Sequence, residues 1–240
     1  MKKKLLLLIT AFILVISFQT QAHYIWIELG SPAKIGQEQE IHIYYGEFNE
    51  GVREIKGGRL EELQGIVAWV IAPDGKQTPL TLTTESKFFR TSFTPGQQGK
   101  YVVVAVNTVR DVVDWSMHDI GIVRPVYYAS REISVGNSQQ VSEIFPPEAV
   151  ILITSTPREK NAFQITFKGK PLASAKVFFH APNEWSKQLT TDKNGVVKFN
   201  PLWKGQYIIE CIYPEKTPGN FKGKEYEAIR HRSTLVLNIQ

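Results

Sequence analysis

The sequence has few residues that bind metals through sulfur or close disulfides. Its 240 residues contain one cysteine and two methionines, one of which is Met1. A single thiol cannot form an internal disulfide, and Cys211 lies in an alternating apolar stretch, so we expect it to be buried. With so few thioethers, a methionine-rich site for monovalent copper is excluded.

Dense basic runs and membrane-length apolar runs are also missing. The formal net charge is +5, but three lysines stand at the very start of the chain, and without them it is +2. Nucleic acid requires a concentrated patch of Lys and Arg, so no nucleic-acid partner is predicted. The apolar run at residues 5–18 is shorter than the roughly 20 residues of a membrane-spanning helix.

The start of the chain has the pattern of a cleaved export signal. Residues 1–22 combine a basic beginning, this apolar run and the small-residue cleavage sequence Thr20-Gln21-Ala22. Cleavage after Ala22 would leave a periplasmic or otherwise secreted protein with no membrane span. Its first residue would be His23.

Catalytic signatures are absent as well. There is no Gly-x-Ser-x-Gly elbow, phosphate-binding loop or His-Glu-x-x-His helix. The protein is therefore predicted not to be an enzyme.

What is present is a repeated strand pattern. Short runs of Val, Ile, Tyr and Phe are separated by Gly, Pro, Asn and Asp, without long helical periods. This pattern predicts an all-β protein of two Ig-like β-sandwich domains of about 100 residues each. The first sandwich would cover 23–135 and the second 150–240, with 136–149 as a linker.

The expected strands are short and regularly spaced. In the first sandwich they are Tyr24–Leu29, Glu40–Tyr45, Gly65–Ile71, Thr78–Thr83, Phe88–Phe93 and Tyr101–Asn107. In the second they are Val150–Ser155, Ala162–Phe167, Ala175–His180, Gln188–Thr191, Val196–Phe199, Gln206–Tyr213 and Arg232–Ile239. Two stretches break the rhythm, a charged one at Gly46–Leu63 and an aromatic one at Arg110–Tyr128. Both are expected to be long functional loops.

Several segments carry a family resemblance. They are Ala22–Glu28, Gly169–Val177, Thr191–Phe199, Gly205–Tyr207 and Ile229–Leu235. Together they resemble a large family of exported bacterial proteins of unknown function, similar to the periplasmic component of nickel and cobalt uptake systems. The second half also resembles the carboxypeptidase-regulatory or transthyretin-like sandwich. Many of these relatives carry a histidine directly after the glycine that matches Gly46, where this chain has Glu47.

A histidine at the head of the mature chain is a candidate metal ligand. The α-amine and the Nδ1 of His23 would close a chelate ring on one ion. Divalent copper and nickel favour such nitrogen donors, and an α-amine with a pKa of about 8 is readily displaced by a metal near neutral pH. The predicted cofactor is therefore a divalent transition metal, either Cu or Ni/Co.

Four further residues are candidate partners of His23. His118 and Asp119 stand together in the aromatic stretch. His42 lies on an expected strand that could run beside the one that follows His23. His231 enters the last strand and could reach His23 only across the interface between the two sandwiches.

These observations predict a soluble periplasmic protein that binds a transition metal for uptake, delivery or buffering. An inner-membrane metal transporter is its candidate partner. One alternative is a structural or interaction module of the cell envelope without metal. Another is a copper-dependent enzyme that oxidises polysaccharide, with Trp115, Trp185 and Trp203 as a sugar-stacking surface.

Overall fold

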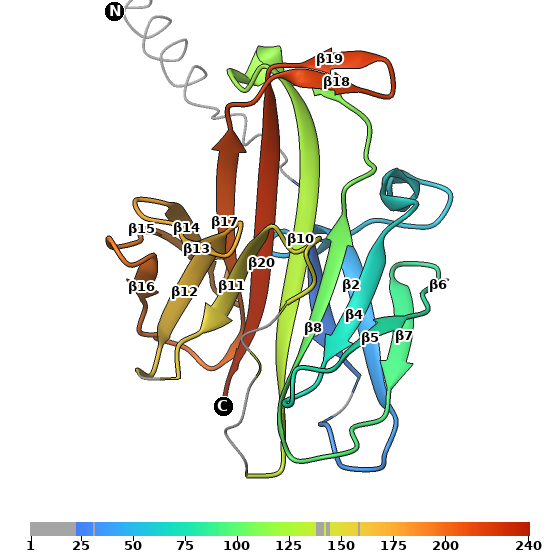
Figure 1. Cartoon of the computed structure of the whole chain (residues 1–240), viewed down its shortest axis with the longest axis vertical. Helices are drawn as coiled ribbons and strands as arrows, with labels where there is room; N and C mark the ends of the chain where they lie inside the picture. The colour runs from blue at the N-terminus through green and yellow to red at the C-terminus, as the bar shows by residue number, and fades with distance from the viewer. Residues whose placement is uncertain (1–22, 31, 138–141, 143–144, 158) are drawn as a thin grey trace, which may run out of the picture.

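The computed structural model describes residues 23–30, 32–137, 142, 145–157 and 159–240. The predicted signal peptide and its cleavage position at Ala22 lie outside these residues. Within them the regular secondary structure is almost entirely β-strand, with two short 3-10 turns (Figure 1). The prediction of an all-β sandwich protein is confirmed.

The strands and turns have the following bounds in chain order. The first half contains β1 Tyr24–Leu29, β2 Gln39–Glu47, β3 Val52–Arg53, η1 Arg59–Leu63, β4 Val67–Ile71, β5 Gln77–Leu80, β6 Thr83–Thr84, β7 Phe89–Phe93, β8 Gly99–Asn107, β9 Val113–Asp114, η2 Ser116–His118 and β10 Ile122–Val135. The second half contains β11 Ile151–Ser155, β12 Ala162–Phe167, β13 Lys170–Pro171, β14 Lys176–His180, β15 Ser186–Thr190, β16 Val196–Lys198, β17 Gly205–Glu215, β18 Gly219–Phe221, β19 Lys224–Tyr226 and β20 Ala228–Ile239.

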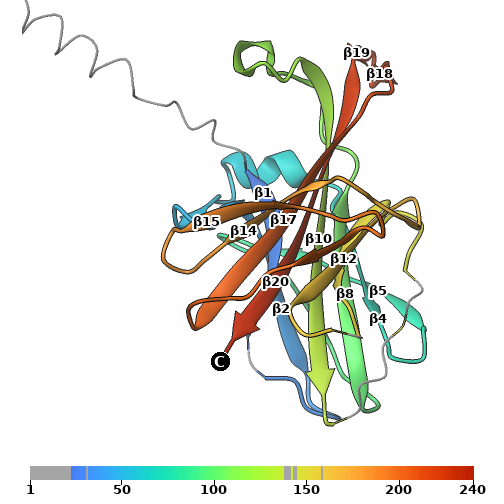
Figure 2. The ribbon, with the colours of Figure 1, turned by 90° about the vertical axis from the view of Figure 1, so that its left-hand side faces the viewer.

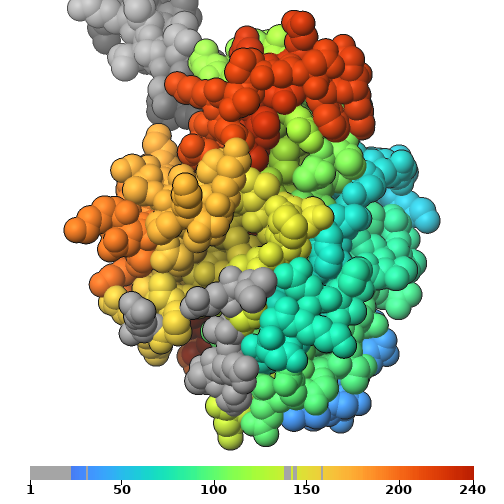
Figure 3. All heavy atoms as spheres, viewed as in Figure 1, coloured from blue at the N-terminus to red at the C-terminus, as the bar shows by residue number. Residues whose placement is uncertain are grey.

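The strands form three layers, and the largest sheet is the middle one. That sheet has the order β15-β14-β17-β20-β10-β8-β4-β5, with β9 beside β10. The sheet β1-β2-β7-β6, with β3 beside β2, covers one of its faces, and the sheet β11-β12-β13, with β16 beside β12, covers the other. β18 and β19 form a separate hairpin at one end of the molecule, which is red in Figure 3.

The central sheet runs across the predicted linker. β10, from the first half, pairs in parallel with β20, from the second, between Val123↔Ala228 and Ser130↔Leu235. The division at 136–149 stays a prediction about domains, but the strands on its two sides share one continuous sheet.

Strand β10 contributes to the cores on both faces of this sheet. Tyr127 and Ala129 pack into the core beneath β1 and β2, whereas Val126 and Tyr128 pack into the core beneath β11 and β12. Side chains alternate along a strand, so a strand covered on both faces is apolar at nearly every position. This explains the uninterrupted burial of residues 125–131.

The expectation of a loop over the whole of Arg110–Tyr128 is wrong. The segment contains β9 and η2, and β10 already begins at Ile122. Pro125 interrupted the strand pattern in the sequence, since proline cannot donate a ladder hydrogen bond. Pro125 pairs with β20 on one side only, because the pairing of β10 with β8 begins at Tyr127. No backbone N–H is therefore needed from Pro125 toward β8.

Strand β1 lies across the central sheet and determines where the chain's early residues are held. It pairs with β2, with Tyr24 opposite Gly46, and it crosses the face of β10 and β20 (Figure 2). Trp26 of β1 is fully buried in a cluster with Ile208 of β17 and Val236 of β20. This packing brings His23, directly before β1, onto the central sheet.

Candidate functional site

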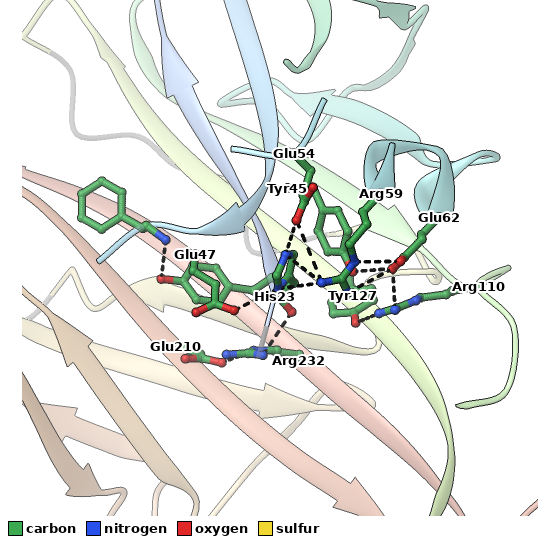
Figure 4. A network of polar contacts seen from close by, with 12 residues as sticks. His23, Tyr45, Glu47, Glu54, Arg59, Glu62, Arg110, Tyr127, Glu210 and Arg232 are labelled. Atoms are coloured by element: carbon green, nitrogen blue, oxygen red, sulfur yellow. Dashed lines mark hydrogen bonds and ion pairs between the residues drawn. The ribbon is translucent and has the colours of Figure 1, made fainter. Parts of the chain in front are cut away.

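His23 is buried and attached to the central sheet through its backbone. Its residue exposure is only 5%. The guanidinium Nη1 of Arg232 donates a hydrogen bond of 3.1 Å to the carbonyl oxygen of His23. Thr234 Oγ1 donates one of 2.7 Å to the carbonyl oxygen of Ile25. The bond from Arg232 is drawn in Figure 4, and together the two bonds from β20 fix the beginning of β1.

Two carboxylates lie on opposite sides of the His23 ring. The Nδ1 atom is 2.9 Å from Oε1 of Glu47, and the Nε2 atom contacts Oε1 of Glu54. The Nη1 atom of Arg59 is 3.0 Å from the same Nε2. The edge of the ring also packs on Tyr45, with 5.2 Å between the ring centroids.

A tight turn after β2 places both carboxylates. Glu47 is the last residue of β2, and β3 folds back against it so that Gly46 lies opposite Arg53. Gly46 has a φ of +147°, and an added Cβ would lie 2.2 Å from the carbonyl oxygen of Val52. The amide of Glu54 then donates to the carbonyl oxygen of Tyr45 at 2.8 Å. Only glycine fits this close approach of the two strands.

The environment keeps the imidazole neutral and makes one carboxyl unusually basic. Burial lowers the pKa of His23, and the Arg59 charge adds to the lowering, although the hydrogen bond to Glu54 opposes it. Burial raises the pKa of Glu47 to about 7, with the Glu50 carboxylate adding to the effect. A neutral imidazole is the form that binds a metal.

The contact between His23 and Glu47 has a feature that fits a metal ion. Oε1 of Glu47 is buried and has no hydrogen-bond partner of correct geometry, although Nδ1 lies only 2.9 Å away. When Nε2–H donates to Glu54, Nδ1 presents a lone pair, so two acceptors face each other and need a proton or a cation. Two ligand atoms that each lie about 2.0–2.1 Å from a metal, at a right angle, are about 2.9 Å apart. This matches the distance between Nδ1 of His23 and Oε1 of Glu47.

The partner of Nε2 also fits the usual surroundings of a metal-bound histidine. Such a histidine commonly donates its other ring N–H to a carboxylate, which orients the ring and raises its basicity. Glu54 is in position to accept that hydrogen bond. Once cleavage had created the amine, the metal donors in this chain would be the α-amine, Nδ1 of His23 and Oε1 of Glu47, with Glu54 holding Nε2.

A second polar network adjoins the first from the other half of the chain. Arg232 contacts Glu210 through Nε, and both residues are nearly fully buried. Nε2 of His180 is 2.9 Å from Oε2 of Glu210, and its Nδ1 is 2.9 Å from Nδ2 of Asn49. Burial alone would raise the pKa of Glu210, but the charge of Arg232 and the bond to His180 lower it to about 2.

This lowered pKa predicts a loss of stability in acid. Because the pKa of Glu210 in the folded chain lies below its ordinary value of 4.5, its stabilising contribution is complete above about pH 4.5. The contribution is lost as the pH falls from 4.5 toward 2. The urea midpoint measured against pH should therefore drop across this window. In Glu210→Gln this drop should be smaller, and an equal drop would assign the acid sensitivity to other groups.

The structure does not bring His42 to His23. The strand that carries it is the neighbour of β1, as the sequence suggested, but the two run antiparallel and His42 lies opposite Glu28. That is five residues along β1 from His23, or about 16 Å. The His42 ring stacks on Phe88 and lies 2.5 Å from Glu40 Oε1.

His118 and Asp119 are exposed in and after the turn η2. This turn belongs to the segment 109–121, which Lys222 of the β18–β19 hairpin contacts through Val109 and Asp111. In the described part of the chain, neither side chain is hydrogen-bonded or ion-paired to the residues around His23.

His231 lies on the wrong face of the sheet to join His23. It is next to Arg232 on β20, and successive side chains point to opposite faces. Its ring is buried against Tyr128, whose hydroxyl is 2.9 Å from Nδ1, and Glu215, whose Oε2 is 2.9 Å from Nε2. Of the predicted metal ligands, only His23 lies in this cluster.

Sequence reasoning missed the residues that surround His23. Glu47 entered it only as a departure from a histidine pattern, and Glu54, Arg59 and Arg232 were not singled out as site residues. A usable signal was the concentration of charges in Gly46–Leu63 shortly after β2. These charges meet the imidazole only because the segment after β2 folds back beside the beginning of β1, and the sequence does not show this fold-back.

Side chains alone do not complete a metal site here. Among the described residues, no three or more His, Cys, Asp or Glu side chains are grouped so that they could hold a metal ion. A metal at His23 would therefore need the α-amine as well. The described residues also include no helix long and apolar enough to cross a membrane.

Comparisons with known proteins identify a family but no activity. The profile of a domain of unknown function, DUF4198, matches residues 20–215. No curated protein matches the chain. Two solved structures show limited similarity at 10% identity. One is a DUF4785 family protein from Legionella pneumophila, with a TM-score of 0.32 over 81% of this chain and 52% of that one. The other is the BSP domain of a biofilm-associated protein, with a TM-score of 0.20 over 89% of this chain and 30% of that one. The chain thus spans about half the length of the first and less than a third of the second.

Proposed function

This chain belongs to the DUF4198 family, and we propose that it is an exported, non-catalytic protein that binds a divalent transition metal at His23. The ligands would be the α-amine exposed by cleavage after Ala22, Nδ1 of His23 and Oε1 of Glu47. Nickel, cobalt and copper all suit such a donor set. The resemblance to the periplasmic component of nickel and cobalt uptake supports a role in uptake, delivery or buffering.

One observation carries the proposal. The buried Oε1 of Glu47 has no hydrogen-bond partner and lies 2.9 Å from a ring nitrogen of the residue at the predicted cleavage position. A bound cation would satisfy both atoms.

Blocking the α-amine should abolish tight binding. Protein that begins at His23 should bind Cu²⁺ and Ni²⁺, and acetylation of the α-amine should weaken binding at least about a hundredfold, because an amide is a far poorer donor than the free amine. Acetylation at neutral pH favours the α-amine, since its pKa of about 8 is below that of lysine. Isothermal titration and intact mass would measure both steps. An acetyl group is preferable to extra residues, because a chain extended before His23 offers the metal a new chelate.

Side-chain variants complete this test. Glu47→Gln should weaken metal binding about tenfold, whereas Glu85→Gln should not change it, since Glu85 is paired with Arg90 outside the cluster. Equal metal affinity of the acetylated and free forms would disprove the proposal. So would a secreted protein that does not begin at His23. A structural role in the cell envelope would then remain.

A further inference from the structure

Arg230 forms no ion pair with a carboxylate of the described residues, although Glu210 lies near enough to act on its charge. It lies two residues before Arg232 on β20, so both side chains leave the same face of the central sheet. Arg232 is paired with Glu210, and Arg110 is paired with Glu62 at 2.5 Å. Within the described residues, no carboxylate or carbonyl accepts a hydrogen bond from half-buried Arg230.

Trp115 holds Arg230 together with Arg110. The guanidinium carbon of Arg230 lies 5.6 Å from the centroid of the Trp115 ring, and that of Arg110 lies 5.8 Å from it. The turn around η2 fixes the main chain that carries the indole, since the amide of Trp115 donates to the carbonyl oxygen of Gly121 at 2.9 Å. Two guanidinium groups are thus held against one ring.

This group of residues is continuous with the surroundings of His23. The guanidinium of Arg110 is 5.4 Å from the ring of Tyr127 and 5.9 Å from that of Tyr45, which in turn packs on His23. Burial lowers the pKa of Arg230 to about 10, and the positive charges of Arg232 and Arg110 add to the lowering, although the carboxylate of Glu210 opposes it. A cation crowded by like charges is stabilised when an anion binds.

We propose that Arg230, with Arg110 against Trp115, binds a carboxylate group of a small organic acid that carries the metal ion to His23. Guanidinium groups pair with carboxylates through two parallel hydrogen bonds, a geometry that lysine cannot reproduce. The donors at His23 and Glu47 leave coordination positions for other ligands, and a carboxylate chelator would fill them. This inference rests on the proposed metal site.

Citrate binding to the metal-free protein tests the anion site. Protein that begins at His23 should bind citrate in isothermal titration at constant ionic strength, and Arg230→Met should weaken binding about tenfold or more. Arg230→Lys should restore little of it, because the paired hydrogen bonds need a guanidinium. Lys224→Met is the matched control: it removes the same charge from exposed β19 and should bind citrate as the parent does. Citrate should also change the tryptophan fluorescence, and Trp115→Phe should remove that change.

Titration with metal separates this inference from the proposed function. Arg230→Met should keep the parent's affinity for Ni²⁺ added as the chloride but bind nickel citrate about tenfold less tightly. Equal citrate affinity of Arg230→Met and the parent, or equally tight binding of sulfate, would overturn the carboxylate site while leaving the metal site intact. If citrate binding depends on Arg230 but acetylation of the α-amine leaves nickel affinity unchanged, the metal proposal fails and the anion site remains.

Discussion

Arg232→Met is expected to lower the free energy of unfolding by about 3–5 kcal/mol, because it leaves the carboxylate of Glu210 buried without its counter-charge. Glu210 is 2% exposed and Arg232 is 4% exposed, so water cannot replace the lost partner. The variant also loses the hydrogen bond to the carbonyl oxygen of His23 and the packing of the guanidinium over Tyr24. Typical domains are stable by only 5–15 kcal/mol, so denaturant unfolding would show a large shift.

A second variant separates the cost of an unpaired charge from general damage to the core. Adding Glu210→Leu to Arg232→Met removes both charges and should recover much of the lost stability, since apolar groups often replace a buried ion pair at little cost. Lys198→Met removes a member of the exposed pair with Glu159 and should hardly change the denaturation midpoint. If Arg232→Met unfolds at the same denaturant concentration as the parent, the buried pair is not a major source of stability.

Gly46→Ala is expected to destabilise the protein by about 3 kcal/mol or more, because the new Cβ would lie 2.2 Å from a backbone oxygen. That oxygen belongs to Val52, and neither strand can move away without breaking the pairing of β2 with β1 or with β3. Chemical denaturation measures the loss. Because Glu47 follows directly, the variant should also weaken metal binding.

Gly51→Ala is the matched control for this effect. Gly51 also has a positive φ, of +67°, in the same turn, but nothing lies within 4 Å of an added Cβ. Its replacement should therefore cost only about 1 kcal/mol, from backbone strain alone. Similar losses in the two variants would show that the close approach at Gly46 contributes little.

The strand pattern was largely predictable from local sequence. β1 has the predicted bounds Tyr24–Leu29, because a run of aromatic and β-branched residues that ends shortly before Gly30 and Pro32 indicates a strand directly. Strand β10 was not predictable in the same way, and no strand was expected over Ile122–Val135. Its residues are buried on both faces and include Pro125, so neither alternation nor propensity indicated a strand.

The candidate site was predictable only at its central residue. The succession of a basic start, an apolar run and small residues in 1–22 indicates where the chain would be cut, and this requires no tertiary information. The partners of His23 come from the turn after β2 and from β20, which is more than 200 residues away along the chain. No local pattern relates these segments to one another.

By itself the sequence determined an all-β fold, the position of β1 and a histidine at the predicted head of the mature chain, since each depends on neighbouring residues. The tertiary structure decided which charges meet that histidine. The register of β1 on β2 brought Glu47 to it rather than His42, and strand alternation on β20 turned Arg232 toward it and His231 away. A shift of one residue in β20 would exchange Arg232 and His231, and only packing of the whole sheet selects the register.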